Sequence, residues 1–327
     1  MVSLSIKKPG IPAIIWCAGL TAVIGMIAAN VPLFNILAYM IWLIPAIIFI
    51  RQEGLKKGLV ALTIAGILMI IGLQSFKEGL FYIIQFLPAS IIVGLLLKNH
   101  VSTNRSLFII IGTATGIGGF LLGYSWLAGF LDITELRRHL LSTIDPYMEI
   151  LKQTNALEVQ QARGYTEAMV REMLKETVEL SIQLIPASTI LGVLVSVVFN
   201  YFLAGKILTR INSYQTPLNP FSQWQLPWYI IWLMIAGLAL YLAGPAESIW
   251  AIIGKNLILV DVVISIIIGL AVTVYYFARL SFGWFFKIIL IFILVLNLPV
   301  TLIMLLIIGL FDPAVNFRRL GINKETE

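Results

Sequence analysis

The sequence predicts an all-α membrane protein: a polytopic helical bundle of about eight or nine hydrophobic segments, with an amphipathic helical insert of about 50 residues. Two observations predict this class. The chain of 327 residues is 60% hydrophobic and 12% charged, whereas a soluble protein is roughly a quarter charged. The apolar residues also gather in uncharged blocks of roughly 16–26 residues, and about 20 apolar residues cross a bilayer core. A membrane β-barrel would instead alternate apolar and polar residues.

Nine apolar segments are expected to cross or enter the membrane. The first is expected to be a retained span rather than a cleaved signal peptide, because a second span follows at once and no small-residue cleavage site is evident. The last contains Asn297–Pro299, and proline there is able to break it into a re-entrant pair, so the side of the C-terminus stays open. The nine segments lie at about 11–29, 32–50, 57–74, 80–97, 107–131, 182–204, 228–244, 256–278 and 284–310.

A polar stretch divides the spans, so the chain is expected to have three parts. Residues 1–131 form a five-span N-terminal half, residues 132–181 an extracytoplasmic amphipathic helical insert, and residues 182–327 the C-terminal spans and a short polar tail. Asp132 and Glu135 are three residues apart, which predicts a capping box at the start of the first insert helix.

The insert carries a second helix-start signal and two apolar stripes. Asp145 precedes Pro146, and proline is favoured in the first turn of a helix. Each stripe needs a partner, which is the other insert helix, the bilayer surface or the mouth of the bundle. We expect the insert to cap the outer end of the bundle with its stripes inward, either as a solvated cap or as a lid over a polar cavity. The stripes are formed by Ile133, Leu136, Leu140, Ile144, Tyr147 and Leu151, and then by Val170, Leu174, Val178 and Ile182.

Basic residues fall on one side of the predicted membrane. The net charge is +6, and the insert, with nine acidic and six basic residues, contributes −3, so the remainder carries +9. Lys and Arg are enriched in cytoplasmic loops, which predicts a multi-pass protein of the cytoplasmic membrane with a cytoplasmic N-terminus and an external insert. These basic residues are therefore expected to lie beside the lipid bilayer, and no nucleic-acid partner is predicted. The cations expected inside are Lys7, Lys8, Arg51, Lys56, Lys57, Lys98, Arg105, Lys206, Arg210 and Arg279; Lys77 and Lys255 fall outside.

Cysteine and histidine are too scarce for a disulfide framework or a metal centre. Cys17 is the only cysteine, and His100 and His139 are far apart in the sequence. The predicted spans also contain no paired acids, Ser–Lys dyad or His cluster of the kind that intramembrane catalysis requires. The sequence therefore predicts no metal, no cofactor and no enzymatic activity.

Small residues predict faces on which helices approach closely. Four of them in the first span recur at steps of four, three and four, which keeps them on one helix face. This face is expected either to pack inside the bundle or to dock a membrane-protein partner. Its members are Ala18, Ala22, Gly25 and Ala29. A second close contact is predicted by glycines at four-residue spacing, Gly112 with Gly116 and Gly119 with Gly123.

Polar side chains at membrane depth are costly and often functional. Asp261 is the only acid well inside a predicted span, and about 26 Å of helix separates it from Arg279. We therefore expect it near the outer boundary, either beside Lys255 in a structural role or facing a water-filled cavity. Asn35 and Gln85 are expected to join helices by hydrogen bonds or to contact a ligand. The candidate solute-binding residues are Asp261, Asn35, Tyr39 and Gln85.

Three stretches, "PLNPFSQWQLPWYIIW", "IIIGLAVTVYYFARL" and "IIGLFDPAVNFRRL", resemble the YybS-like family of uncharacterised bacterial integral membrane proteins. The resemblance rests on the Pro-aromatic entry to a span, on Gly269–Ala271 in a late span, and on an ending made of Gly309–Asp312 and Phe317–Arg319. It covers most of the chain and implies a polytopic helical membrane protein.

A weaker similarity is to the substrate-capture (S) components of energy-coupling-factor transporters and to MreD-like proteins. The stretch "LIPAIIFIRQEGLKKGLVAL" looks like the proline-containing second span of S components and the basic turn that follows it. Ala18 and Ala22 fall where that family contacts its membrane coupling partner. The resemblance implies capture of a small solute with a membrane partner. The alternative is a non-transporting scaffold of MreD-like type for envelope or signalling partners.

Overall fold

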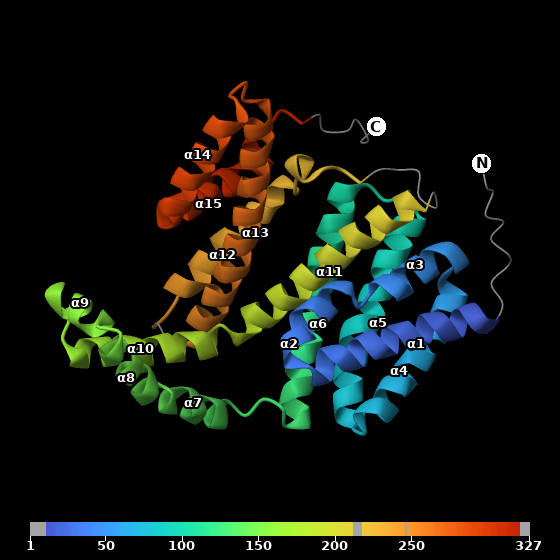
Figure 1. Cartoon of the computed structure of the whole chain (residues 1–327), viewed down its shortest axis with the longest axis horizontal. Coiled ribbons are helices and arrows are strands. Elements are labelled where there is room, and N and C mark those ends of the chain that lie inside the picture. The colour runs from blue at the N-terminus through green and yellow to red at the C-terminus, as the bar shows by residue number, and fades with distance from the viewer. Residues whose placement is uncertain (1–10, 212–217, 246, 321–327) are drawn as a thin grey trace.

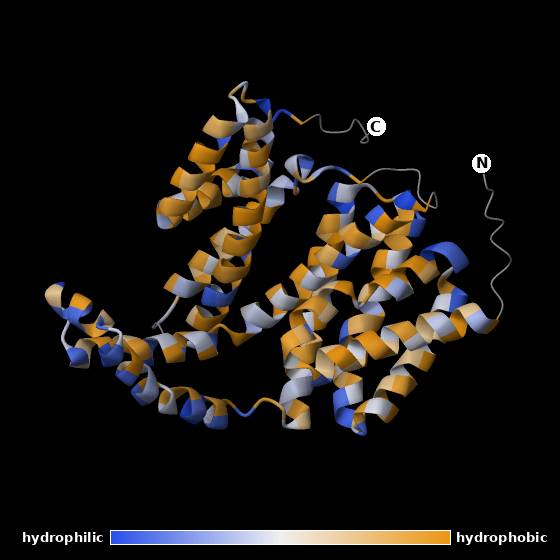
Figure 2. Ribbon diagram, viewed as in Figure 1, coloured by the Kyte–Doolittle hydropathy of each residue, from blue (hydrophilic) through white to orange (hydrophobic). Residues whose placement is uncertain are grey.

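The fold is a bundle of membrane-spanning helices. The computed structural model describes residues 11–211, 218–245 and 247–320. Within these ranges every regular element is a helix, and eight stretches are long and apolar enough to cross a bilayer. Hydrophobic residues dominate the bundle, whereas hydrophilic residues gather on the insert and near the ends of the helices (Figure 2). The predicted fold class is confirmed.

The helices form three consecutive groups (Figure 1). The first group is α1 (Ile11–Asn30), α2 (Pro32–Ile41), α3 (Ile44–Glu53), α4 (Leu55–Leu73), α5 (Phe76–Lys98) and α6 (Thr103–Ala128). The insert is α7 (Ile133–Ser142), α8 (Ile144–Gln153), α9 (Ala156–Ala162) and α10 (Glu167–Gln183). The rest is α11 (Ile185–Arg210), the 3-10 turns η1 (Phe221–Gln223) and η2 (Trp228–Ile230), α12 (Ile231–Leu242), α13 (Ile249–Arg279), α14 (Trp284–Leu296) and α15 (Leu298–Val315).

The long helix α11 joins two packed units. On one side it packs against α6 and against the α2–α3 span, so it completes the bundle formed by α1–α6. On the other side it contacts α13, which packs in turn against α12 and α15. The chain therefore builds a larger N-terminal unit and a smaller C-terminal unit that share α11.

One end of the molecule is rich in cations, and we call it the basic end. It carries Arg51 of α3 beside His100 after α5, with 3.5 Å between Arg51 Nη2 and His100 Nε2. The segment after α11 returns to the same end, because the Gln225 amide donates to Asn104 Oδ1 at 3.2 Å. The described cations at the basic end are Arg51, Lys56, Lys57, Lys98, Arg105, Lys206, Arg210, Arg279, Lys287, Arg318 and Arg319. Lys7 and Lys8 lie outside the described residues.

The opposite end is the insert end, where α6 and α11 join the insert. Lys77 Nζ at the start of α5 donates to the Ala128 carbonyl at the end of α6, at 3.2 Å. Lys255 Nζ of α13 donates to Gln183 Oε1 at the end of α10, at 2.8 Å. The sequence therefore separated the two ends of the bundle correctly, with Lys77 and Lys255 opposite the main cation group.

The second span is broken in the middle, between α2 and α3. Pro45 has no N–H group and disfavours a helical conformation in the residue before it. Asn200 of α11 bonds the backbone at this break: its Oδ1 accepts from the Leu43 amide at 3.1 Å, and its Nδ2 donates to the Tyr39 carbonyl at 3.0 Å. Ser196 Oγ donates to the same carbonyl at 2.8 Å. Irregular backbone is tolerated at membrane depth only where such partners exist.

The last predicted segment, 284–310, consists of two helices. α14 and α15 meet at Asn297, which is followed by Leu-Pro. The Tyr276 hydroxyl near the end of α13 donates to the Phe317 carbonyl at 2.6 Å, so α15 ends at the basic end. α14 and α15 therefore form a helical hairpin that starts and ends at the basic end, so Arg318 and Arg319 join the other cations instead of lying opposite them.

The start signals of the insert were predicted in part. Asp132 caps α7 as expected, because its carboxylate accepts from the Thr134 and Glu135 amides at 2.9 and 3.0 Å. Asp145 does not cap α8, which begins one residue before it. Its carboxylate instead accepts a hydrogen bond from the Arg171 guanidinium of α10, and this bond raises the pKa of Arg171 above its ordinary value.

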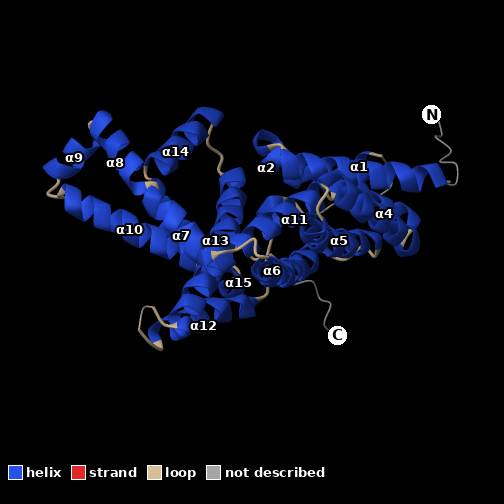
Figure 3. Cartoon of the chain, turned by 90° about the horizontal axis from the view of Figure 1, so that it is seen from below, coloured by secondary structure: helices blue, strands red, loops and turns tan. Residues whose placement is uncertain are grey.

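The apolar stripes of the insert pack against each other, and not onto the bundle. The insert extends from the ends of α6 and α11 away from α1–α5 in two perpendicular views (Figures 1 and 3). The predicted placement over the outer end with both stripes inward is therefore wrong. The physical reason is that two complementary stripes in one hairpin remove each other from water. The shared cluster contains Ile144, Met148 and Leu157, with Leu141, Leu151, Val170, Leu174 and Val178 packed around them.

Candidate functional site

A cavity of about 500 Å³ opens at the insert end, and we call it the insert-end cavity. Ligand sites for small molecules span roughly 300–1,000 Å³, so its size suits a small solute. Its walls come from α1, α5, α6, the residues after α6 and the start of α11. The lining residues are Ala29, Glu78, Phe81, Tyr82, Leu121, Leu122, Ser125, Phe130, Leu131, Ile185 and Thr189.

One carboxylate stands among aromatic rings in this cavity. Glu78 is in the first turn of α5, where its backbone is fixed because its amide donates to Ser75 Oγ at 3.2 Å. Phe81 and Phe130 meet edge to face, with ring centroids 6.2 Å apart. An ionised carboxylate beside aromatic faces favours a cation, since both attract positive charge. Hydroxyl groups of Tyr82 and the remaining polar lining residues add hydrogen-bonding positions.

Glu78, Tyr82 and Ser125 were not among the residues predicted from the sequence to bind a solute. A signal was present: Ser75 and Glu78 form the Ser-x-x-Glu pattern of a capping box, which places Glu78 at a helix start. Glu78 and Tyr82 are four residues apart on α5, so they share one face. Only the packing of α5 against α6 shows that this face meets Ser125.

Tyr39 lies behind this cavity and not in it. Its ring meets Trp42 edge to face at a centroid distance of 5.6 Å, and Trp42 meets Tyr82 in the same manner at 5.7 Å. Tyr39 is therefore connected to the lining residue Tyr82 through the Trp42 ring. Its carbonyl group also belongs to the hydrogen-bonded break between α2 and α3.

Asn35 and Gln85 are also outside the cavity lining. Asn35 Nδ2 donates to the Ala28 carbonyl at 2.6 Å, which ties the start of α2 to the end of α1. This is the helix-joining role that was one of its two predicted roles. Gln85 is half-buried on α5, one turn beyond Phe81, and is not among the residues that line the insert-end cavity.

Asp261 is fully buried in α13, well away from the insert-end cavity. Ser265 Oγ donates to its Oδ2 at 3.3 Å, while Oδ1 has no hydrogen-bond partner among the described residues. Lys255 is bonded to Gln183 instead, so a pair between Asp261 and Lys255 is not what the structure contains. The depth expected for Asp261, near the outer boundary, stays a prediction, because burial shows which neighbours cover the side chain and not how deep it lies in a membrane.

The small-residue face of α1 is covered by the chain's own helices. Ala18, Ala22 and Gly25 are buried against the bundle, where α1 packs on α4. A Cβ atom at Gly25 would lie 2.8 Å from Met69 Cε and 3.0 Å from Trp42 Nε1. Internal packing therefore accounts for these three residues, and partner docking through them finds no exposed surface. Ala29 is half-buried and lines the insert-end cavity.

The glycine pairs of α6 do not mediate a close helix contact. A Cβ atom at Gly112, Gly116, Gly119 or Gly123 would meet nothing within 4 Å, so that prediction is wrong. Gly118 faces α11 instead, and a Cβ atom there would lie 3.0 Å from Ile190 Cα. The closest contact involves Gly309 of α15, which lies directly against α13.

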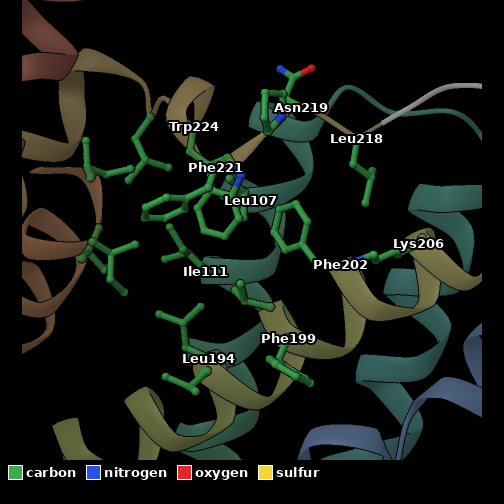
Figure 4. A pocket seen from close by; sticks show the side chains of 18 of the residues that line it. Leu107, Ile111, Leu194, Phe199, Phe202, Lys206, Leu218, Asn219, Phe221 and Trp224 are labelled. Carbon is green, nitrogen blue, oxygen red and sulfur yellow. The ribbon is translucent and has the colours of Figure 1, made fainter. Parts of the chain in front are cut away.

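A second, larger cavity of about 1000 Å³ lies between the two units, and we call it the basic-end cleft. Its walls come from α6, α11 and α13, and the strap, residues 218–226, crosses it (Figure 4). The strap is held by stacking of Trp224 on Phe202, with ring centroids 4.3 Å apart. The lining residues are Leu107, Ile111, Leu194, Val195, Val198, Phe199, Phe202, Gly205, Lys206, Thr209, Arg210, Leu218, Asn219, Pro220, Phe221, Trp224, Leu226, Ile264, Ile267 and Ile268.

Neither cavity has the side chains of a metal centre. Among the described residues, no group of three or more His, Cys, Asp or Glu side chains is placed to hold a metal ion. Glu78 is the one carboxylate that lines the insert-end cavity. The two cavities differ in their lining: the insert-end cavity contains an acidic group, whereas the basic-end cleft is apolar with Lys206 and Arg210 at its rim.

Among the described residues, eight helical stretches long and apolar enough to cross a bilayer define a polytopic helical membrane protein. A family model described as "Predicted membrane protein (DUF2232)" matches residues 19–313, and the chain belongs to this family. The match agrees with the expectation of an uncharacterised integral membrane family. Neither the curated proteins nor the solved structures include a match to this chain.

Proposed function

We propose that the protein captures a small cationic or hydrogen-bond-donating solute in the insert-end cavity, in a transport-related role like that of S components. The observation that carries the proposal is a cavity of about 500 Å³ with one carboxylate among aromatic rings and hydroxyl groups. Most small-molecule sites combine apolar walls with a few polar groups that fix orientation. The bilayer is the protein's environment, because eight stretches are long and apolar enough to span it.

The lining residues support binding rather than chemistry. Glu78 supplies the charge that recognises a cation, and Tyr82 with Phe81 supplies aromatic surface beside it. Ser125 and Thr189 approach from α6 and α11 and offer hydroxyl groups for orientation. We assign no catalytic residue, in keeping with the predicted absence of enzymatic activity.

Glu78→Gln is expected to weaken cation binding at least tenfold, because it removes the carboxylate and keeps the shape of the side chain. The backbone bond from the Glu78 amide to Ser75 remains, so the helix start is retained. Binding of radiolabelled tetraphenylphosphonium, an aromatic monovalent cation, to the purified full chain measures the effect. Glu247→Gln is the matched control, since Glu247 is an exposed acid between α12 and α13 at the same end. Equal binding by the native chain and both variants would count against the proposal.

We propose further that the basic end faces the cytoplasm and the insert lies outside, with the N-terminus inside. The clustering of Arg51, Lys98, Arg210 and Arg318 at one end supports this orientation. In a Cys17→Ala background, Thr154→Cys is expected to react with an impermeant thiol reagent on intact cells, and Lys57→Cys only after lysis. Thr154 is exposed on the insert and Lys57 is exposed at the basic end. Labelling at position 57 alone would reverse the orientation.

A membrane scaffold of MreD-like type is the second candidate. It is favoured by the insert, which keeps apolar side chains exposed although its stripes are packed together. A scaffold needs no ligand in the insert-end cavity, so the tetraphenylphosphonium experiment separates the two roles. The exposed apolar residues of the insert include Tyr147, Ile150, Val159, Met169, Met173 and Leu180.

A further inference from the structure

The basic-end cleft takes no part in solute capture at the opposite end of the bundle. We propose that it holds one phospholipid with an anionic headgroup, taken from the leaflet at the basic end. Its acyl chains would lie between α11 and α13, and its phosphate would meet Lys206 and Arg210.

One face of α11 changes from apolar to basic along its length, as an amphiphile does. Leu194, Phe199 and Phe202 follow this helix toward the basic end, and Lys206 comes next (Figure 4). Arg210 is one turn beyond Lys206 on the same face. Within the described part of the chain, these two cations are the charged residues among the lining side chains, and no acid lines the cleft. An anionic headgroup complements this rim.

The depth of the cleft matches one leaflet. From Leu194 to Lys206 the helix rises roughly 18 Å, at 1.5 Å per residue. One leaflet contributes about 15 Å of the hydrocarbon core, which is half of its total thickness. Phospholipid acyl chains of one leaflet therefore fit between the inner end of the cleft and its basic rim.

The cleft is closed toward the insert end, where α11 and α13 converge. Asn256 of α13 accepts from the Ala187 amide of α11 at 2.8 Å and donates to the Gln183 carbonyl at 2.7 Å. A helix from another protein would need roughly 30 Å of free length to span the core beside α11. The lined part of the cleft, from Leu194 to Lys206, offers roughly 18 Å, about three-fifths of that length, which favours a lipid over a protein helix.

The cleft is open toward the bilayer. Val195 and Phe199 line it, yet 46% and 42% of their surfaces are exposed. These residues lie on the membrane-crossing part of α11, so the surrounding medium at that depth is hydrocarbon. A lipid is therefore able to enter sideways, without passing the strap.

The strap gives the site a fixed roof above the headgroup position. Its Asn219 amide donates to Thr103 Oγ1 at 3.0 Å. Arg318 Nη1 and Nη2 donate to the Ser222 and Trp224 carbonyls at 2.7 and 2.6 Å. Because the strap is fixed over the apolar part of the cleft, a lipid bound there is expected to exchange more slowly than lipids on an exposed helix surface.

The test is lipid retention by the purified full chain, measured by native mass spectrometry after exchange into phosphatidylglycerol or phosphatidylcholine. The native chain is expected to retain one phosphatidylglycerol at least tenfold better than phosphatidylcholine. Lys206→Gln with Arg210→Gln is expected to abolish this preference, because the phosphate loses both cations. Val198→Trp is expected to reduce retention of both lipids, because the indole fills the apolar slot.

The matched control is Lys56→Gln with Arg319→Gln, which removes two exposed charges from the same end but outside the cleft. It is expected to keep the preference for phosphatidylglycerol. Equal retention of both lipids by the native chain would overturn the proposal, as would an unchanged preference after substitution of Lys206 and Arg210. Displacement of the lipid by inorganic phosphate alone would also overturn it, since the site would then recognise the free anion. Tetraphenylphosphonium binding at Glu78 is independent of every one of these outcomes.

Discussion

Asp312→Ala is expected to lower the free energy of unfolding by roughly 3–5 kcal/mol, because it leaves a buried guanidinium without its counter-ion. Arg318 Nη2 is 2.6 Å from Asp312 Oδ2, and both side chains are fully buried. The same guanidinium donates to two strap carbonyls. If Arg318 shifts after the loss of Asp312, these hydrogen bonds weaken and the strap is held less firmly. Denaturation of the detergent-purified protein, followed by tryptophan fluorescence, measures the change.

Two comparisons make this result specific. Lys57→Ala removes a pair of similar length, 2.7 Å to Glu53, but Lys57 is exposed, so the expected loss is at most about 1 kcal/mol. Asp312→Leu combined with Arg318→Met removes both buried charges and is expected to recover most of the stability. The strap stays unpinned in that double variant, so protease is expected to cleave it there faster than in the native chain. If Asp312→Ala is no more damaging than Lys57→Ala, the buried pair does not hold this end together.

Gly309→Ala is expected to destabilise the protein by roughly 3 kcal/mol or more, since the added methyl group overlaps backbone that has no room to move. A Cβ atom at Gly309 would overlap the Ser265 carbonyl oxygen and lie 2.6 Å from the Gly269 amide nitrogen. Gly269 is in the reciprocal position, because a Cβ atom there would overlap the Leu305 carbonyl. Thermal unfolding in detergent, with the monodispersity of the sample recorded, measures the effect.

Gly116→Ala is the matched control for this substitution. It makes the same chemical change in a membrane-spanning helix, but a Cβ atom at Gly116 would meet nothing within 4 Å. Its effect is expected to be small, and alanine's higher helix propensity favours a slight gain in stability. Equal losses from the two substitutions would mean that the contact between α13 and α15 is looser than the glycine geometry indicates.

The elements of the fold were predictable because each signal is local. Hydrophobic length identified the spans, and Asn297–Pro299 identified the break between α14 and α15. The cap at Asp132 needed only the two amides that follow it. Backbone N–H and C=O groups in the membrane must form hydrogen bonds within their own segment. Sequence patterns therefore specify helices there more directly than in water.

Which helix packs against each helix face was not predictable, because the spacing of residues along one helix does not show which other helix contacts them. Gly112 and Gly116 have the same four-residue spacing that Ala18 and Ala22 have, yet α6 presents its glycines to open space and α1 buries its alanines. For the same reason the sequence did not predict which residues line the insert-end cavity. Asp261 was singled out for its charge at membrane depth, whereas Glu78 met the cavity only through the way α5, α6 and α11 come together.

The anchor of the strap also imposes an order on biogenesis. Arg318 follows the strap residue Trp224 by 94 positions, so the strap leaves the ribosome long before its anchor does. The two hydrogen bonds from Arg318 are therefore added to the strap only after α13, α14 and α15 have been synthesised, whereas the contacts with Thr103 and Phe202 are available earlier. The contacts of Arg318 are therefore the last of the strap's described contacts to become available as the chain is made.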